Sequence, residues 1–214
     1  MNIKYLGHSS FYLKTKEAKV VTDPFTSEIG LTMPKVEADI VTISHSHSDH
    51  NNLDAITGDY LTVDWPGDFE KQNVRIRGIA AFHDDQKGEL RGANILYRID
   101  AENMNILHCG DLGHVPTEAM LDSIGNVDIL MIPVGGQYTL DPKQACQVIA
   151  KIEPSIIIPM HFGRPELKQE TYGQLADIEA FLKEYGAVDA PRMDQLTIKK
   201  EDLTEERRVI VLTS

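Results

Sequence analysis

The sequence predicts a single α/β domain in which two sheets pack face to face and helices cover the outside. Three observations support this fold. The length of 214 residues suits one domain with a sizeable core. Both halves of the chain begin with short segments rich in β-branched and aromatic residues and then add helical segments. No linker or low-complexity segment divides the chain, so we expect residues 1–214 to fold as one unit.

The N-terminal half is predicted to consist mainly of strands. Its predicted strands are residues 3–6, 11–13, 19–22, 39–43, 60–63, 74–82 and 95–99. Asp23-Pro24 ends the third of them, because proline has no N–H to donate to a neighbouring strand. Residues 51–56 are predicted to form a short helix, with Asn51 or Asn52 as its N-cap.

From Met104 onward, predicted strands and helices alternate. The strands are residues 105–108, 128–134, 155–159, 196–199 and 208–212, and the helices are residues 117–124, 143–152 and 166–185. Asp141-Pro142 marks the start of the middle helix, because aspartate is a good N-cap and proline suits the first helical position. Gly186 is placed to end the last helix.

Composition narrows the class of protein. A net charge of −12 disfavours a nucleic-acid-binding surface, which needs clustered Lys and Arg. No apolar stretch is long enough to span a membrane, and no secretory signal follows Met1. Two cysteines are too few for a disulfide framework, so we expect a cytoplasmic protein.

The densest group of chemically reactive side chains is Ser44-His45-Ser46-His47-Ser48-Asp49-His50, directly after the predicted strand at 39–43. Imidazole nitrogens and carboxylate oxygens are ligands that zinc and similar divalent metals prefer. The alternative is a solvated loop with chance histidines. Because histidine provides only 8 of 214 residues, three of them within six positions favour a metal site.

The spacing of this cluster indicates two metal centres. Side chains two apart in an extended segment point the same way, so we expect His45 and His47 to share one ion. A turn at Ser48-Asp49 would direct Asp49 and His50 toward a second ion.

Four further polar residues follow predicted strands, namely His8, His83, Asp111 and His161. Because loops at one edge of a sheet often build a site on a rigid scaffold, we expect these side chains to meet the cluster. In this arrangement His83 completes a site with His45 and His47, and His161 joins Asp49 and His50. Asp111, next to Gly110, bridges the two ions.

These motifs resemble the metallo-β-lactamase fold, whose HxHxDH signature is matched by residues 45–50. Within that superfamily the chain looks most like the UlaG-like metal-dependent hydrolases, which include ascorbate-phosphate lactonases. Residues 6–11, 23–24, 108–111 and 133–139 carry this closer likeness. The resemblance implies a four-layer αββα sandwich and the ligand assignment given above. His108 competes with His83 for the last histidine position, and we choose His83.

Three residues are candidates for roles beyond metal binding. His8 is either a turn histidine or a catalytic residue that acts on a proton near the metals. Arg164, three residues after His161, is the candidate partner of a substrate anion, with an ordinary surface cation as the alternative. Gly136 either presents its N–H to an anionic substrate or simply forms a turn with Gly135.

The predicted function is a hydrolase in which a hydroxide shared by two divalent metals attacks a small ester, lactone or phosphoester. Asp49 is both a ligand and a catalytic candidate. Zinc is the expected metal, with manganese, iron and nickel as alternatives, and the expected partner is a small anionic molecule rather than nucleic acid or membrane. A nuclease on the same fold and a non-catalytic metal-binding protein are the competing hypotheses. The sequence leaves homo-oligomerisation open.

Overall fold

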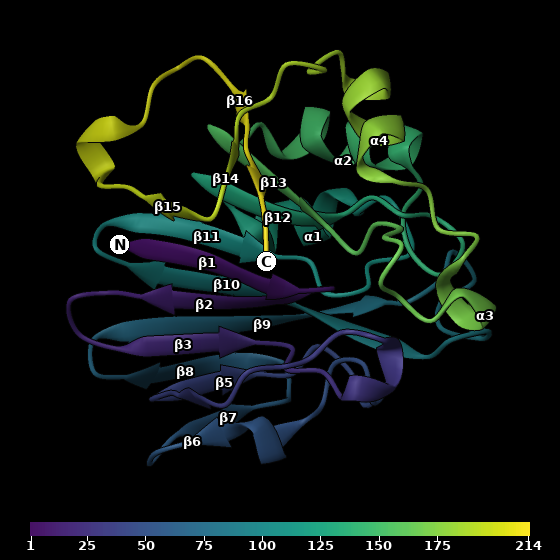
Figure 1. The fold of residues 1–214 in the computed structure, drawn as a ribbon. Coiled ribbons are helices and arrows are strands. Elements are labelled where there is room, and N and C mark those ends of the chain that lie inside the picture. The colour runs from purple at the N-terminus through teal and green to yellow at the C-terminus, as the bar shows by residue number, and fades with distance from the viewer.

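The computed structural model describes residues 1–214 and places two β-sheets one in front of the other (Figure 1). The first sheet has the spatial order β15 (Gln195–Thr197), β1 (Asn2–Gly7), β2 (Ser10–Lys14), β3 (Lys19–Thr22), β5 (Ile40–Thr42) and β7 (Leu61–Val63). The second has the order β16 (Arg208–Val209), β13 (Ile156–Met160), β12 (Ile129–Pro133), β11 (Met104–His108), β10 (Ala93–Ala101), β9 (Val74–Phe82) and β8 (Gly67–Lys71). The predicted pair of packed sheets is confirmed.

One hydrophobic core joins the two sheets. Its buried residues include Ile3 and Phe11 from the first sheet and Tyr97 and Ile129 from the second. Strands β12 and β13 are buried along their whole length. They run parallel to each other, and β12 is also parallel to β11 and β13 to β16. This explains why both have nearly continuous apolar sequences.

The C-terminal segment ties the sheets together. β15 pairs antiparallel with β1, so that Thr197 lies opposite Asn2. A short parallel ladder between β14 (Arg192–Met193) and β17 (Val211–Leu212) lies near β13. The chain therefore begins in the first sheet, builds the second, returns to the first with β15 and adds β16 to the second.

Helices contribute to only one side of the sandwich. α1 (Glu118–Ile124), α2 (Pro142–Ile152) and α4 (Ile178–Tyr185) bury apolar residues in the main core, and α2 lies against α4 (Figure 1). The cap of α2 is as predicted, because Asp141 and Gln144 form a capping box. The longest helix, α2, has 11 residues, and no helix in the chain is long and apolar enough to cross a bilayer.

A thinner layer covers the outer face of the first sheet. It consists of the ladder β4 (Val36–Glu37) and β6 (Ile56–Thr57) with the 3-10 turn η2 (Leu53–Ala55). These elements form a small apolar cluster with Val21 and Val41. The predicted short helix at 51–56 is present only as the 3-10 turn η2, with Asn52 at its N-cap position. It is shorter than predicted, because Asn52 donates its backbone N–H to Pro24 O and its side-chain amide to Phe25 O, and Ile56 continues as a strand.

The predicted helix at 166–185 is also wrong as a single element. It is divided into α3 (Gln169–Tyr172) and α4, and the two are separated by residues 173–177. Ala176 donates its N–H to Gly135 O and accepts the N–H of Gly163, so this segment pairs with distant loops instead of with helical neighbours. Asp177 then caps α4 and Gly186 ends it.

Strand β8 was not predicted, because its sequence Gly67-Asp68-Phe69-Glu70-Lys71 is mostly polar. It pairs with β9, where Arg77 contacts Asp68 at 2.7 Å and Arg75 contacts Glu70 at 3.0 Å. Arginines at alternate positions of β9 thus face acidic residues of β8, a pairing across strands that composition alone does not indicate.

Candidate metal centre

The residues predicted to bind metal lie at one edge of the sheets, on the side of α3 in Figure 1. Each follows the end of a strand: His8 follows β1, His45 follows β5, and His83 follows β9. Asp111 follows β11 and His161 follows β13. The strand ends therefore bring together residues that lie more than 150 positions apart in the sequence.

The loop after β5 contains the predicted turn, whereas residues 44–47 form a bend and not the predicted extended segment. His50 donates its backbone N–H to His47 O at 3.0 Å, which closes a turn around Ser48-Asp49. The rings of His45 and His47 lie 4.6 Å apart, centroid to centroid, on one side of this turn. The turn directs Asp49 and His50 to the other side, toward His161.

Asp111 lies at the centre of the group. Its Oδ2 is 3.2 Å from Nε2 of each of His50, His83 and His161, and 4.0 Å from Nε2 of His45. Gly110 makes this approach feasible, because a Cβ there would lie 2.5 Å from both Ser44 Cβ and Asn94 Oδ1.

The donor atoms form two neighbouring groups around Asp111. His45, His47 and His83 bring their ring nitrogens within 4.8 Å of one another. His8, Asp49, His50 and His161 form a second set within the same distance, and His45, His50 and Asp111 form a third that joins the two. These overlapping groups contain all seven residues predicted to bind metal, together with His8.

Hydrogen bonds beneath the cluster fix which ring nitrogens carry protons. His50 donates from Nδ1 to Asp23 Oδ2 at 2.8 Å, so its Nε2 lone pair faces Asp111. Ser44 donates its hydroxyl to Asp23 Oδ2 at 2.6 Å, and its oxygen therefore accepts Nδ1–H of His45 at 3.0 Å. Asp23, which the sequence left between a turn residue and a partner of a histidine, thus orients two imidazoles.

The carboxylates at the site are held ionised, whereas the imidazoles differ from one another. Burial lowers the pKa of His45 to about 3, and nearby His50 contributes to this shift. Burial also opposes the charged form of His50, but Asp111 and Asp49 raise the pKa of His50 well above its ordinary value. Burial alone would raise the pKa of Asp111, but the adjacent imidazoles of His161 and His50 hold it well below its ordinary value. Neutral imidazole and ionised carboxylate are the protonation states that bind a metal cation.

Three residues at the site have backbone conformations that non-glycine residues rarely adopt. The φ angles are 55° at His8, 40° at Asp23 and 51° at His161. His8 O accepts the N–H of His161 at 2.8 Å and the hydroxyl of Tyr5 at 2.6 Å, which holds two of these loops together. Such strain is typical of functional sites, where the surrounding structure maintains it.

His83, rather than His108, lies with the cluster. His108 is fully buried, its Nε2 donates to Ser9 O at 2.7 Å, and its Nδ1 accepts the N–H of Gly110 at 3.2 Å. Both ring nitrogens of His108 are therefore hydrogen-bonded to backbone atoms. His114 lies at the surface, where Nε2 accepts the N–H of Phe82.

Arg164 and Gly136 were predicted to bind an anionic substrate, and neither is placed to do so. Arg164 contacts Glu166 and Ser214, and it does not line the cavity above the histidines. Gly136 donates its N–H to Leu140 O at 3.0 Å in a tight turn, so that N–H is not free for an anion. The turn interpretation of Gly136 describes the structure.

A cavity of about 280 Å³ opens above these His and Asp residues, which together are called the metal cluster from here on. Its lining residues are His47, Asp49, His83, Arg91, Asp111, Tyr138, His161, Thr171 and Tyr172. Arg91 and Tyr172 line this cavity, although neither was predicted from the sequence to belong to the site. Tyr172 donates its hydroxyl to Asp49 Oδ2 at 3.0 Å, on the same oxygen that His8 Nε2 contacts at 3.2 Å. Its place in a wrongly predicted long helix hid this role.

The residues present fit divalent metal ions. His45 Nε2, His50 Nε2 and Asp111 Oδ1 are buried atoms without a hydrogen-bond partner in the protein. Buried polar atoms are almost always paired, so unpaired lone pairs that converge on one place indicate an external cation.

Comparison with known proteins identifies the family. A model described as a β-lactamase superfamily domain matches residues 2–161. A UPF0173 metal-dependent hydrolase of Alkaliphilus metalliredigens is 30% identical, and the match covers 76% of this chain and 86% of the relative. The chain belongs to the UPF0173 metal-dependent hydrolases of the β-lactamase superfamily. The metallo-β-lactamase fold predicted from the resemblance is confirmed.

Two further relatives cover nearly the whole of this UPF0173 chain. A UPF0173 metal-dependent hydrolase of Methanopyrus kandleri is 26% identical over 87% of the chain and 98% of its own length. A Thermotoga maritima crystal structure described as a candidate Zn-dependent hydrolase of the metallo-β-lactamase superfamily is 34% identical, with a TM-score of 0.82. It covers 99% of this chain and 97% of its own.

Proposed function

We propose that this UPF0173 protein hydrolyses a small ester, lactone or phosphoester and uses two divalent metal ions to do so. Zinc is the metal we favour. The observation that carries the proposal is the position of Asp111 Oδ2, 3.2 Å from three imidazole nitrogens that belong to two different ligand groups. A carboxylate in that position can bridge two ions. The description of the Thermotoga maritima relative as Zn-dependent also favours zinc.

Each group of residues would hold one ion. His45, His47 and His83 are the ligands of the first, and Asp49, His50 and His161 are those of the second. Two such ions, when bound, lower the pKa of a shared water toward 7 from about 15.7 and polarise a carbonyl or phosphoryl oxygen. Asp23 and Ser44 keep His50 and His45 in the tautomers that this arrangement needs.

His8 and Tyr172 both form hydrogen bonds with the Asp49 carboxylate. Burial lowers the pKa of His8 to about 4, with nearby His161 adding to the effect, so His8 is neutral at pH 7 and its Nε2–H donates to Asp49. Asp49 Oδ2 receives this hydrogen bond and the one from Tyr172. We assign His8 and Tyr172 as positioning residues that hold the Asp49 carboxylate beside His50, whose Nε2 lies 3.8 Å from Asp49 Oδ2.

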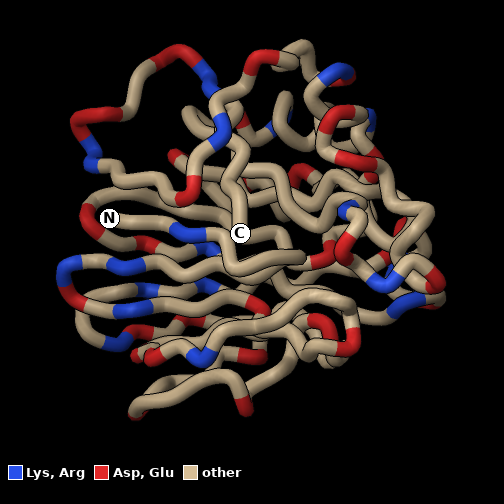
Figure 2. Tube along the Cα trace, in the orientation of Figure 1, with Lys and Arg blue, Asp and Glu red and all other residues tan.

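The size and charge of the site support a small substrate. A cavity of about 280 Å³ lies just below the lower end of the range typical for small-molecule sites. Lys and Arg alternate with Asp and Glu around the chain, and the net charge is −12, which disfavours a nucleic acid (Figure 2). The UlaG-like motifs place lactone phosphates among the substrates to test.

The test combines metal analysis with a substrate panel. Protein purified without chelator or added metal is analysed by mass spectrometry, and we expect about two divalent ions per chain. The same protein is assayed on aryl esters, lactones, sugar lactone phosphates and phosphodiesters, with His47→Ala as the inactive control. Protein that binds no divalent ion, and shows no hydrolysis after zinc or manganese is added, would contradict the proposal.

A further inference from the structure

Arg91 lies between the cavity above the metal cluster and a second hollow. The second hollow, here called the Trp65 groove, has a volume of about 500 Å³. Its lining residues include Trp65, Pro66, Ala80, Ile95, His47 and Arg91. Because His47 and Arg91 line both spaces, a ligand that reaches the cluster can extend past Arg91 into the groove.

The loop that carries Arg91 is fixed by one carboxylate. Asp84 accepts four backbone N–H bonds of 2.8–3.0 Å, from Gln86, Gly88, Leu90 and Arg91 itself. The backbone of Arg91 is therefore held in place next to His83, which begins the same loop.

The guanidinium of Arg91 has no acidic partner. One nitrogen, Nη2, donates to Gln137 O at 3.1 Å, and Cζ lies 5.6 Å from the centre of the Tyr138 ring. No carboxylate lies within 4.0 Å of it, whereas Arg75, Arg77 and Arg98 each have such a partner. A guanidinium has five N–H donors, so most of those on Arg91 remain free to bind an anion in the cavity.

The groove next to Arg91 offers an apolar and aromatic surface. The Trp65 side chain is 71% exposed, which is unusual for so large an apolar group. The turn that carries it packs closely on β9, where a Cβ at Gly78 would lie 2.7 Å from Trp65 O. The indole is thus presented to solvent by a rigid turn.

We propose that Arg91 is the specificity residue of this hydrolase, and that it binds a carboxylate or phosphate group of the substrate beside the bond to be cleaved. The apolar part of the same substrate lies against Trp65. The preferred substrates are therefore anionic esters, lactones or phosphoesters with an apolar arm. This inference rests on the proposed function, because it assumes that the cavity above the metal cluster is the reaction site.

Trp65 makes the proposal measurable without turnover. It is the only tryptophan in the chain, so its fluorescence reports on the groove alone. Zinc-loaded protein is titrated with benzylphosphonate, whose C–P bond is not hydrolysed, and with its neutral diethyl ester. We expect a saturable change in Trp65 emission with benzylphosphonate and at least about 10-fold weaker binding of the neutral ester, as for loss of a hydrogen bond to a charged group.

Variants separate Arg91 from general charge effects. Arg91→Met should raise the Kd of benzylphosphonate by about 10-fold or more, and Arg91→Lys should raise it less. Lys87→Met is the matched control, because Lys87 lies on the same loop but lines neither space, and its Kd should equal that of the wild type. Zinc content and circular dichroism confirm that each variant is folded and loaded.

The outcomes are distinguishable. Equal Kd values for wild type and Arg91→Met, or equal binding of the anion and its neutral ester, would overturn the role of Arg91. Saturable binding with no change in Trp65 emission, established by calorimetry, would overturn the role of the groove. If the substrate panel shows no hydrolysis while Arg91→Met still weakens anion binding, the proposed function fails and the anion site stands.

Discussion

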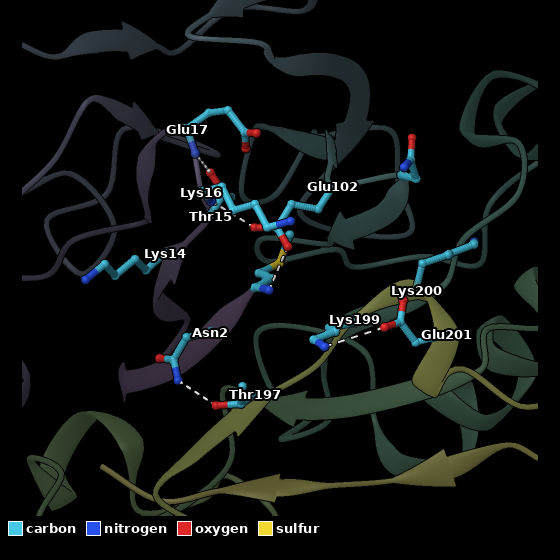
Figure 3. Close-up of a pocket in the computed structure, with 12 residues that line it drawn as sticks. Asn2, Lys14, Thr15, Lys16, Glu17, Glu102, Thr197, Lys199, Lys200 and Glu201 are labelled. Carbon is cyan, nitrogen blue, oxygen red and sulfur yellow. Dashed lines mark hydrogen bonds and ion pairs between the residues drawn. The ribbon is translucent and has the colours of Figure 1, made fainter.

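The two ends of the sheets differ in what their polar residues do. At one end, the His and Asp side chains of the metal cluster are mostly buried and converge on Asp111 below a cavity of about 280 Å³. At the other end, next to the start of β1, a hollow of about 620 Å³ is lined largely by Lys, Glu, Thr and Asn side chains (Figure 3). The larger hollow is therefore not the one with the clustered metal donors.

Several of the charged groups at the second end are paired with neighbouring charges. Lys199 contacts Glu201 at 3.5 Å, and Lys200 contacts Asp128 at 2.8 Å (Figure 3 shows the first of these). Glu102 accepts the amine of Met1 at 2.8 Å and the N–H of Lys16 at 2.8 Å. Convergent, unpaired donor atoms distinguish a metal site from a polar surface hollow, and volume does not.

The largest effect on activity should come from substitution of Asp111, which lies at the centre of the metal cluster. Asp111→Asn removes the carboxylate shared by both ligand groups, and we expect loss of metal and at least an about 1000-fold fall in kcat, equivalent to several kcal/mol. Metal content and steady-state hydrolysis measure this. Asp68→Asn removes an exposed carboxylate on β8 and should change neither. A kcat within tenfold of the wild type would contradict the central role of Asp111.

Asp49→Ala should sharpen the division into two centres. Asp49 belongs only to the group with His8, His50 and His161, so we expect one ion per chain instead of two. The fall in kcat should be at least about 100-fold, because only one of the two metal ions would remain to activate water and polarise the substrate. Native mass spectrometry counts the ions. Loss of both ions together would mean that the two groups form one inseparable site.

A smaller effect is expected from the carboxylate beneath the cluster. Asp23→Asn keeps the shape of the side chain but removes the charge that His50 Nδ1–H and the Ser44 hydroxyl contact. We expect metal affinity to fall by about 10- to 100-fold, as for other partners of metal-bound histidines. Competition with a chromophoric chelator measures it. An unchanged affinity would show that His50 is oriented by packing alone.

The smallest effect on activity should come from the second end. Glu102→Gln should leave hydrolysis unchanged and lower the free energy of unfolding at pH 7 by at most about 1 kcal/mol. Burial raises the pKa of Glu102, but hydrogen bonds from the Met1 amine and Lys16 N–H lower it below the ordinary value of 4.5.

The pH dependence of this variant follows from that sign. A carboxylate with a lowered pKa stabilises the fold above its ordinary value, and the contribution is lost as pH falls through the lowered folded-state value. The difference in unfolding free energy between wild type and Glu102→Gln should therefore be present at pH 7 and shrink as the pH is lowered below 4.5. Denaturant unfolding at several pH values measures it. A fall in hydrolysis would contradict the contrast between the two ends.

Much of the fold was predictable because local signals agree with tertiary packing. Asp141-Pro142 starts α2, Gly186 ends α4, and the apolar run before the cluster forms β5. The failures have different causes. The helix at 166–185 is interrupted because Ala176 pairs with the distant Gly135 and with Gly163. Strand β8 was missed because its mostly polar sequence hides a hairpin with the adjacent β9, in which Arg75 pairs with Glu70 and Arg77 with Asp68.

The sequence by itself determined the chemistry of the site. The spacing of His45, His47, Asp49 and His50 predicts a group of metal ligands with a turn at Ser48-Asp49, and that turn is a local property of the backbone. Only the tertiary structure decided which distant residues complete the site. It placed His83 in the cluster and His108 among backbone atoms, and it put Arg91 in the position expected of Arg164. These choices depend on where separate strands end relative to one another, which no local pattern contains.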